Sequence, residues 1–344
     1  PFTDADSPLT TTMTVTLKVT AGSLTAATAD GVTVTGTTLA RTFTGTLAAL
    51  NAYFTASPTR ITYTPAANNT ADRILSATIS QRSGGTAAAS STTARIAITP
   101  VNDAPSLSVP ASFTVTEDVK GNLAWPATAT PFVDVDSPTL TVTLAVQDGV
   151  ISAAGTATVA VGGTDTVRTF AGTTAALNAY FKTLGKIAYT TARDNTVARI
   201  LTATVSDGSL VATKTSTISI KPVNDAPTIN AVATLAGAVS STPFEITYDA
   251  LRAAANVADP DNANPSLMIT KIDSGTLQRW NGTAWVAVST ASSRPTATSL
   301  LAPGQKLRWI PPAGSTGDTV AFKIKAWDGA LASATIAQVV VRVA

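Results

Sequence analysis

Apolar and polar residues alternate over short stretches along most of the chain. Between residues 13 and 19, Met, Val, Leu and Val are separated by Thr, Thr and Lys, and residues 140–146 repeat this arrangement. A period of two is that of a β-strand with one face buried and the other in water. The pattern predicts strands at 13–19 and 140–146, with further strands at 96–98, 199–205, 216–220 and 335–343.

Turn signals separate these predicted strands. Asp-Gly and Gly-Gly pairs, such as those at 148–149 and 162–163, supply the residues that tight turns require. About seven short strands in roughly 120 residues predict an immunoglobulin-like β-sandwich. Leu50–Phe54 is expected to form at most a one-turn helical crossover at a sandwich edge, and a short helix is expected over Tyr248–Ala255.

The sequence contains internal repeats. Leu-Asn-Ala-Tyr-Phe occurs at 50–54 and at 177–181, and Pro-Val-Asn-Asp-Ala-Pro occurs at 100–105 and at 222–227. The last third is a diverged copy, in which Asp-Pro-Asp at 259–261 replaces Asp-Val-Asp at 134–136. Repeats of this kind indicate tandem modules. We therefore predict an all-β array of three modules, over residues 1–100, 101–222 and 223–344.

Composition excludes several classes of function. The chain of 344 residues has no Cys and no His, which removes disulfides, thiolate nucleophiles, Ser-His-Asp triads and the usual zinc sites. A net charge of +2 without clusters of basic residues gives no indication of nucleic-acid binding. No apolar run approaches the roughly 20 residues that span a bilayer. We expect no enzymatic activity, because the paired carboxylates lie in repeated linkers and not in one cleft.

Acidic residues favour aspartate and recur at fixed places. Of the 21 acidic residues only Glu117 and Glu245 are glutamates. Each linker carries Asn-Asp, the following module opens with Asp-x-Asp, and an Asp-Gly comes late in that module. Asp-x-Asp on an extended strand would direct both carboxylates to one side. Since calcium takes six to eight oxygen ligands, this set predicts a calcium site at each junction. Metal-free turns are the alternative interpretation, which we prefer for Asp30, Asp148, Asp165 and Asp318.

These motifs resemble the cadherin-like tandem repeats of long bacterial surface proteins and adhesins. The resemblance is carried by Val101-Asn102-Asp103-Ala104-Pro105, by the same motif at 223–227, and by Thr116-Glu117-Asp118. It implies calcium between successive modules. At the second junction the implied ligands are Glu117, Asp194 or Asn195, Asn224, Asp225, Asp259, Asp261 and Asp328. Glu117 could instead be a surface residue.

The first junction has a smaller implied set. Its ligands would be Asn102, Asp103, Asp134, Asp136 and Asp207, with help from Asn68, Asn69 or Asp72. It has no glutamate, because the first module lacks the strand that would carry one. Asp4 and Asp6 would begin a further site, but Gln81 stands where the late Asp belongs, so that site should be absent or weak.

The first module also starts at the equivalent of Phe132, so it lacks a counterpart of the strand expected within Leu107–Thr116. Two explanations compete. The chain is a segment of a longer array, or a neighbouring chain supplies the strand and links subunits head to tail.

The expected function is that of a rigid, secreted segment of a bacterial surface adhesin or filament, stiffened by Ca²⁺, with other copies or neighbouring modules as partners. The alternative is a carbohydrate- or host-binding module, with the third module as the binder of a glycan or cell-surface ligand. That module holds Trp280, Trp285, Trp309 and Trp327, which are either core and sheet-face residues or a sugar platform.

Overall fold

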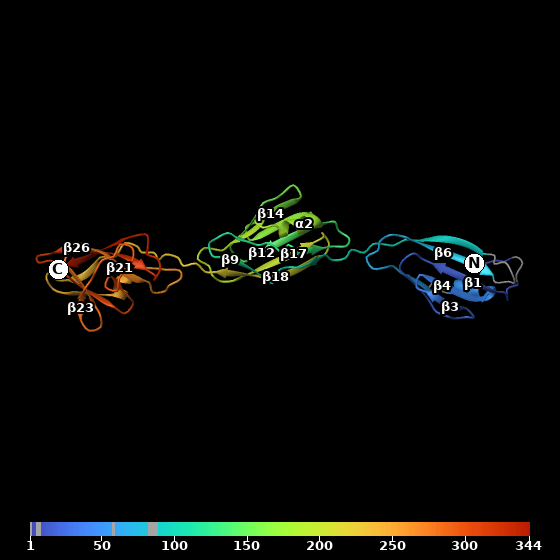
Figure 1. Cartoon of the computed structure of the whole chain (residues 1–344), viewed down its shortest axis with the longest axis horizontal. Helices are drawn as coiled ribbons and strands as arrows, with labels where there is room; N and C mark the ends of the chain where they lie inside the picture. Colours follow the sequence, from blue (N-terminus) through green and yellow to red (C-terminus); the bar gives the residue numbers. More distant parts are fainter. Residues whose placement is uncertain (1, 5–7, 57–58, 82–88) are drawn as a thin grey trace.

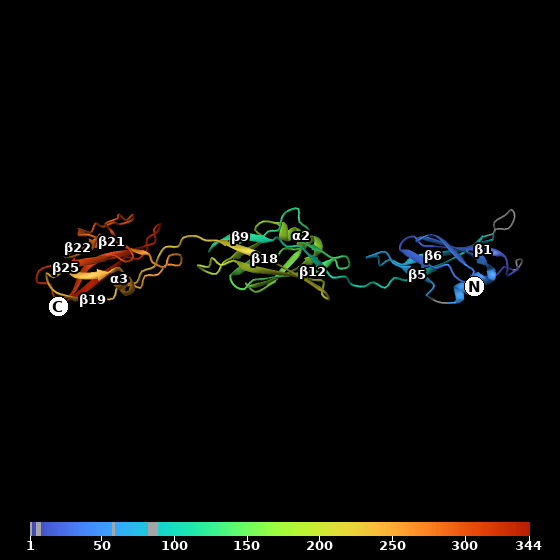
Figure 2. The same cartoon turned by 90° about the horizontal axis from the view of Figure 1, so that it is seen from below.

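The computed structural model describes residues 2–4, 8–56, 59–81 and 89–344, and its three lobes lie in a row joined by narrow connections (Figures 1 and 2). Each lobe has its own hydrophobic core. The three cores draw on residues from Phe2 to Ile96, from Leu107 to Ile220, and from Ile229 to Val343. The fold is an all-β array of three sandwich modules, as the alternating pattern predicted. Within the described residues, no helix is both long and apolar enough to cross a membrane.

The secondary structure follows one plan in the three modules. The first contains β1 (Thr12–Lys18), β2 (Ser23–Ala26), β3 (Thr33–Thr37), β4 (Ala40–Thr46), α1 (Leu47–Ala56), β5 (Ile61–Thr64), β6 (Arg73–Gln81) and β7 (Ala89–Ile96). The second contains β8 (Ser106–Leu107), β9 (Ser112–Thr116), β10 (Gly121–Asn122), β11 (Phe132–Val133), β12 (Thr139–Ala145), β13 (Val150–Ala153), β14 (Val159–Gly163), β15 (Val167–Thr173), α2 (Thr174–Lys182), β16 (Ile187–Thr190), β17 (Arg199–Ser206) and β18 (Val211–Lys221). The third contains β19 (Leu235–Ala238), β20 (Phe244–Thr247), α3 (Tyr248–Ala254), β21 (Ser266–Ile272), β22 (Thr276–Trp280), β23 (Trp285–Ala287), β24 (Leu300–Leu301), β25 (Lys306–Ile310), β26 (Gly317–Trp327) and β27 (Ala337–Val343).

Each module packs a larger sheet against a smaller one. In the second module the larger sheet has the order β14-β15-β12-β17-β18-β9 and the smaller one β10-β16-β13. The alternation in β12 explains the packing, because Leu140, Val142 and Leu144 are buried while the threonines between them are not. Burial of these apolar faces supplies the main stabilisation of each sandwich.

One edge of the first module is open. In the second and third modules, β9 and β19 add in parallel to β18 and β27. The large sheet of the first module has the order β3-β4-β1-β6-β7, and no strand among the described residues pairs with the outer edge of β7. The predicted lack of a first strand is therefore seen directly as an unpaired sheet edge.

The predicted strand at 96–98 was wrong at its end, because β7 stops at Ile96. In the second module, β18 continues to Lys221, and its last residues pair with β9. Beyond Ile96, β7 has no strand partner on either side among the described residues. Without inter-strand hydrogen bonds, Ala97 and Ile98 fall outside the strand.

The repeated Leu-Asn-Ala-Tyr-Phe segment forms more helix than the single turn expected. The helices α1 and α2 span 10 and nine residues, and Thr173 caps α2 by accepting a hydrogen bond from the amide of Ala176. In α2, the Asn178 side chain accepts from the Phe132 amide and donates to the Phe132 carbonyl, at 2.9 and 2.8 Å. The helix thus fixes the backbone two residues before Asp134. The short helix expected over 248–255 was confirmed as α3.

Of the aspartates interpreted as turn residues, Asp30, Asp148 and Asp165 lie in turns, but Asp318 was wrongly interpreted, because it lies in β26 opposite Arg342; all four carry ion pairs. Asp30, Asp165 and Asp318 pair with Arg60, Arg168 and Arg342. Asp148 accepts two hydrogen bonds from the Arg199 guanidinium, at 2.6 and 2.8 Å, which hold the pKa of its carboxyl below the ordinary value.

The Asp148–Arg199 pair predicts acid sensitivity in the second module. A lowered carboxyl pKa gives stability that is present above the unfolded-state pKa and is lost as the pH falls through the folded-state pKa. We expect Asp148→Asn to lower the melting temperature of this module by about 4 °C at neutral pH, and to have little effect below pH ~3. Scanning calorimetry across pH checks this. Asp165→Asn, which removes a more exposed carboxyl, is the control and should change little; equal losses at every pH would contradict the assignment.

Candidate metal centre at the module junctions

The linker before the third module is held against that module by two hydrogen bonds. The Asn224 side-chain amide donates to Asp328 Oδ2 at 2.8 Å, and the backbone amide of Asp225 donates to Asp261 Oδ2 at 2.7 Å. Asp328 Oδ1 accepts from the amides of Ala330 and Leu331. Burial raises the pKa of Asp328, but the amides of Leu331 and Ala330 and the Asn224 side chain outweigh it and lower the pKa. Four of the predicted ligands therefore meet at one end of the third module.

The Asp-x-Asp pair lies in a turn and not on an extended strand as expected. Asp259 Oδ1 accepts from the amides of Asp261 and Asn262, both at 2.8 Å, which is the side-chain turn that aspartate favours. This leaves the second carboxylate oxygen of Asp259 for another partner. That atom, Oδ2, is buried and has no hydrogen-bond partner among the described residues, and the same is true of Asp225 Oδ2.

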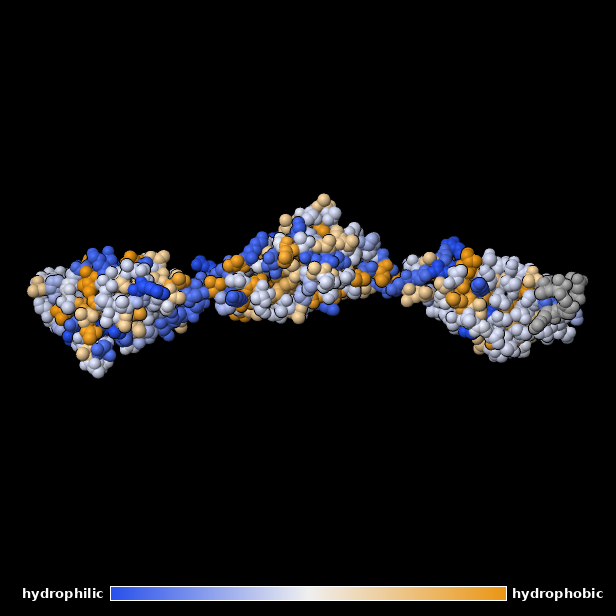
Figure 3. Space-filling model, in the orientation of Figure 1, coloured by the Kyte–Doolittle hydropathy of each residue, from blue (hydrophilic) through white to orange (hydrophobic). Residues whose placement is uncertain are grey.

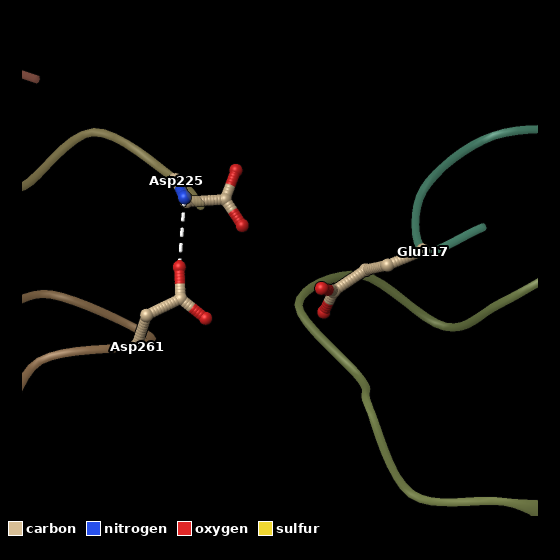
Figure 4. A group of neighbouring side chains, drawn as sticks. All are labelled: Glu117, Asp225 and Asp261. Atoms are coloured by element: carbon tan, nitrogen blue, oxygen red, sulfur yellow. Dashed lines mark hydrogen bonds between the residues drawn. The ribbon is translucent and has the colours of Figure 1, made fainter. Parts of the chain in front are cut away.

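The second module contributes carboxylates to the same place. Carboxylate oxygens of Glu117, Asp225 and Asp261 lie within 4.8 Å of one another, and so do those of Asp118, Asp194 and Asp225. In Figure 4 the Glu117 side chain points from its own module toward Asp225 and Asp261. The two groups share Asp225, so this aspartate is the centre of the cluster.

Glu117 is positioned by the sheet that precedes it. It directly follows β9, its amide donates to the Lys221 carbonyl at 2.9 Å, and its Oε2 accepts from the amide of Val223 at 3.1 Å. Only 1 % of the residue is exposed, so the alternative that Glu117 is a surface residue was wrong. A buried carboxylate needs compensation beyond one amide, which a cation at this position would give.

The pKa of Asp225 reflects its burial and the negative charges gathered around it. Burial first, then the carboxylates of Asp194, Asp261 and Asp118, raise the pKa of Asp225, and Arg193 opposes them. Several like charges therefore face one half-buried carboxylate. Figure 3 shows the same concentration of hydrophilic residues at the narrow connections between lobes.

Asp118 was not among the predicted ligands, although the Glu-Asp pair in the sequence was a signal for it. Its φ of 53° turns the chain after β9, and its Oδ1 accepts from the Asp194 amide at 3.2 Å. Asn195, the alternative to Asp194, lies elsewhere: its side chain contacts Asp148 and accepts from the Val197 amide. Of the two, only Asp194 reaches the junction.

The first junction repeats the linker geometry. Asn102 donates to Asp207 Oδ2 at 2.7 Å, the Asp103 amide donates to Asp136 Oδ2 at 2.8 Å, and the Asp136 amide donates to Asp134 Oδ1 at 2.9 Å. Asp134 Oδ2, like that of Asp259, is buried without a partner among the described residues. Hydrogen bonds from Leu210, Asn102 and Ser209 lower the pKa of Asp207.

The first junction nevertheless has no carboxylate cluster of three within the described part of the chain. Asp72, named as a helper, instead pairs with Arg95 and accepts from the Ile98 amide at 2.9 Å. Asn69 accepts from the Ala71 amide in its own loop. The further site expected around Asp4 and Asp6 cannot be placed, because Asp6 lies outside the described residues.

The oxygen-only donor set suits calcium. Carboxylates, side-chain amide carbonyls and backbone carbonyls are the ligands that this ion takes, and three buried carboxylate oxygens at the two junctions have no other partner among the described residues. The residues present therefore fit calcium, with the second junction better supplied than the first.

The tryptophans of the third module differ in burial, with Trp327 half-buried at the end of β26. Trp309 is fully buried, as expected for a core residue. Trp280 and Trp285 lie half-buried on β22 and β23 with ring centroids 5.4 Å apart. Lys306 Nζ lies 5.4 Å and the Arg308 guanidinium 4.6 Å from the Trp285 ring, so cation–π contacts cover this ring.

No protein-family model matches the sequence, and a search of curated proteins returns no match. Among solved structures, the chain is similar to an endo-fucoidan hydrolase of glycoside hydrolase family 107, at 14 % identity and a TM-score of 0.24, covering 94 % of this chain and 39 % of that one. It is similar to extracellular cadherin domains 1–4 of protocadherin gamma B7, at 14 % identity and a TM-score of 0.40, covering 94 % and 67 %. It is also similar to an I-band fragment of titin, at 9 % identity and a TM-score of 0.28, covering 97 % and 93 %. The all-β fold itself rests on the strand pairing described above.

Proposed function

We propose that the chain is a structural segment of an extracellular, bacterial surface protein, an adhesin or filament, whose modules are locked in line by calcium. The observation that carries this proposal is the cluster at the second junction, where Glu117 comes from one module and Asp225 and Asp261 from the next. A cation held by these residues would join two modules through their charges. The partners would be neighbouring modules or other copies.

Each residue group has a distinct task in this joint. The linker hydrogen bonds of Asn224 and the Asp225 amide hold the linker on the third module. The turn at Asp259 presents one carboxylate oxygen that has no hydrogen-bond partner among the described residues, and Glu117, after β9, approaches from the other side. Calcium, when bound, would supply positive charge that offsets the mutual repulsion of these carboxylates. The function would be mechanical, and we propose no catalytic role.

Thermal unfolding in calcium and in EGTA tests the proposal. Metal that binds only the folded junction stabilises it by about 2.7 kcal/mol when free calcium is 100 times its dissociation constant. We expect a higher melting temperature in calcium for the modules that meet at the second junction. Magnesium, which keeps its water ligands more strongly, should have a smaller effect and serves as the control. Identical melting curves in calcium, magnesium and EGTA would remove the calcium mechanism.

A second candidate is a carbohydrate- or host-binding role for the third module, favoured by the surface position of Trp280 and Trp285. A sugar would have to displace Arg308 and Lys306 from the Trp285 ring. Quenching of tryptophan fluorescence by glycans, reduced by Trp285→Ala, would support this role. Unchanged fluorescence across a glycan panel would leave the structural role alone.

A further inference from the structure

The first module has an incompletely covered core. Six apolar residues of the second module, namely Ile187, Tyr189, Leu201, Ala203, Val205 and Ile218, are at most 1 % exposed. Their counterparts in the repeat, Ile61, Tyr63, Leu75, Ala77, Ile79 and Ile96, are all only partly buried. The same holds for Phe54, whose counterpart Phe181 is fully buried. The two modules have nearly the same core residues, so the difference lies in what covers them.

The second module shows what covers these positions. Between residues 107 and 125 it carries five apolar side chains that are at most 7 % exposed, namely Leu107, Phe113, Val115, Leu123 and Trp125. Trp125 packs edge-on against Phe113 and Phe181, with centroids 5.3 and 4.9 Å away. This segment, residues 105–126, has no counterpart among the described residues of the first module.

The uncovered region of the first module is hollowed. A groove runs along β6 and β7 and is lined by Phe2, Val15, Ala77, Ile79 and the serines and threonine at 90–92. In the second module, β8 lies against the corresponding strands, β17 and β18, and brings Leu107 to the core. The groove in the first module therefore lies at the position that Leu107 fills in the second module.

The outer edge of β7 offers matching backbone groups. In the second module, the Thr217 amide donates to the Ala111 carbonyl and the Glu117 amide donates to the Lys221 carbonyl. In a parallel pair, alternate residues of one strand face the same neighbour, so Thr217, Ser219 and Lys221 all face β9. Their counterparts in the first module are Arg95, Ala97 and Thr99. The amide of Ile98 between them donates to Asp72, on the opposite side.

We propose that this open edge is a strand-acceptor site, which takes in an extended segment with the side-chain pattern of residues 105–126. The segment adds in parallel to β7, with aliphatic and aromatic side chains in the groove and over Phe54. The open side of Arg95, Ala97 and Thr99 supplies the backbone pairing. The acceptor belongs to the first module, because the equivalent edges of the second and third modules are already covered by β9 and β19.

Strand capture has a consequence for the first junction, which rests on the calcium function proposed above. Glu117 follows β9 directly and reaches the second junction. A captured segment in the same register would bring its own glutamate beside Val101, next to the linker with Asp103. Capture would then complete the carboxylate set that the first junction lacks, and strand and calcium would each increase the affinity for the other.

A synthetic peptide of residues 105–126 tests capture, with hydrogen exchange of the whole chain measured in EGTA so that calcium plays no part. We expect the peptide to slow amide exchange at 95–99 by at least about tenfold, because paired strand amides open less often than free ones. Exchange at 211–221, where β9 already pairs, should not change.

Two controls make the test specific. A peptide with Phe113→Asp should give no protection, because a charge would enter the apolar groove. Ala97→Pro in the chain removes one amide from the open side and should abolish capture while leaving the melting of the first module unchanged. Absence of protection by the unmodified peptide, protection confined to 211–221, or equal protection by the Phe113→Asp peptide would overturn the proposal.

The calcium coupling is tested separately, with the same peptide carrying Glu117→Gln. Both peptides should protect residues 95–99 in EGTA, but only the glutamate form should raise the calcium affinity of the first junction. Protection without any calcium effect would contradict the coupling and leave the strand-acceptor site in place.

Discussion

Replacing Asp225 by asparagine is expected to weaken calcium binding at the second junction by at least about tenfold. Asp225 belongs to both carboxylate groups at this junction, and its Oδ2 atom is buried without another partner among the described residues. Asparagine keeps the size of the side chain but removes the negative charge that the cation would meet. Calorimetric titration with calcium measures the loss.

The same substitution is expected to have the opposite effect in EGTA. A carboxyl whose folded-state pKa is raised contributes stability below its unfolded-state pKa and loses it as the pH rises through the folded-state pKa. At neutral pH without calcium, the ionised Asp225 therefore opposes the folded junction. Asp225→Asn should unfold at an equal or higher temperature than the unmodified chain in EGTA, and at a lower temperature in calcium.

Two matched variants control for this result. Asp103→Asn changes the equivalent linker residue at the first junction, where no group of three carboxylates forms among the described residues, and should cost less calcium affinity. Asp318→Asn removes an exposed carboxylate paired with Arg342 and should cost none. If all three variants lost the same affinity, the assignment of the second junction as the main site would be wrong.

The second large effect is expected from Phe181→Ala, which should destabilise the second module by about 3–5 kcal/mol. Phe181 is fully buried and its ring lies within 5.0 Å of the rings of Trp125, Phe132 and Phe170, measured between centroids. Removing it opens a cavity that these rings cannot fill without moving. Urea unfolding of the full chain, followed by hydrogen exchange in each module, measures the cost.

The repeat supplies the control. Phe54 stands at the same position in the first module but is only partly buried, and no tryptophan packs against it among the described residues. Phe54→Ala should therefore cost only about 1–2 kcal/mol, because less surface leaves water and no closed cavity forms. Equal costs for the two substitutions would show that the first module is as closed as the second.

Strand positions and the core could be predicted well from the sequence. The alternation over 140–146 determines which side of β12 is buried, because successive side chains of a strand point to opposite faces of the sheet. The helix α1 was underestimated, since the motif Leu50–Phe54 covers only half of it and Thr46, which caps it, lies outside the motif. A cap of this kind works through a single hydrogen bond from a backbone amide to the threonine hydroxyl, which the composition of the segment hardly reveals.

The candidate ligands could be predicted by recurrence, but their geometry could not. The sequence indicates that Asp259 and Asp261 act together, yet it does not show that one oxygen of Asp259 is used by its own turn. Asp72 shows the opposite case: it is an expected helper at the first junction, but Arg95 and the backbone amide of Ile98 already engage its carboxylate. Whether a carboxylate is free depends on partners brought by other strands, which spacing alone does not reveal.

The distribution of distances between two modules tests the central claim, that calcium stiffens the junction, most directly. The chain has no cysteine, so Thr215→Cys on β18 and Thr276→Cys on β22 place one spin label on each side of the second junction. Double electron–electron resonance between the two spin labels should give a narrow distance distribution in calcium and a broad one in EGTA. Distributions of the same width in both conditions would contradict the account.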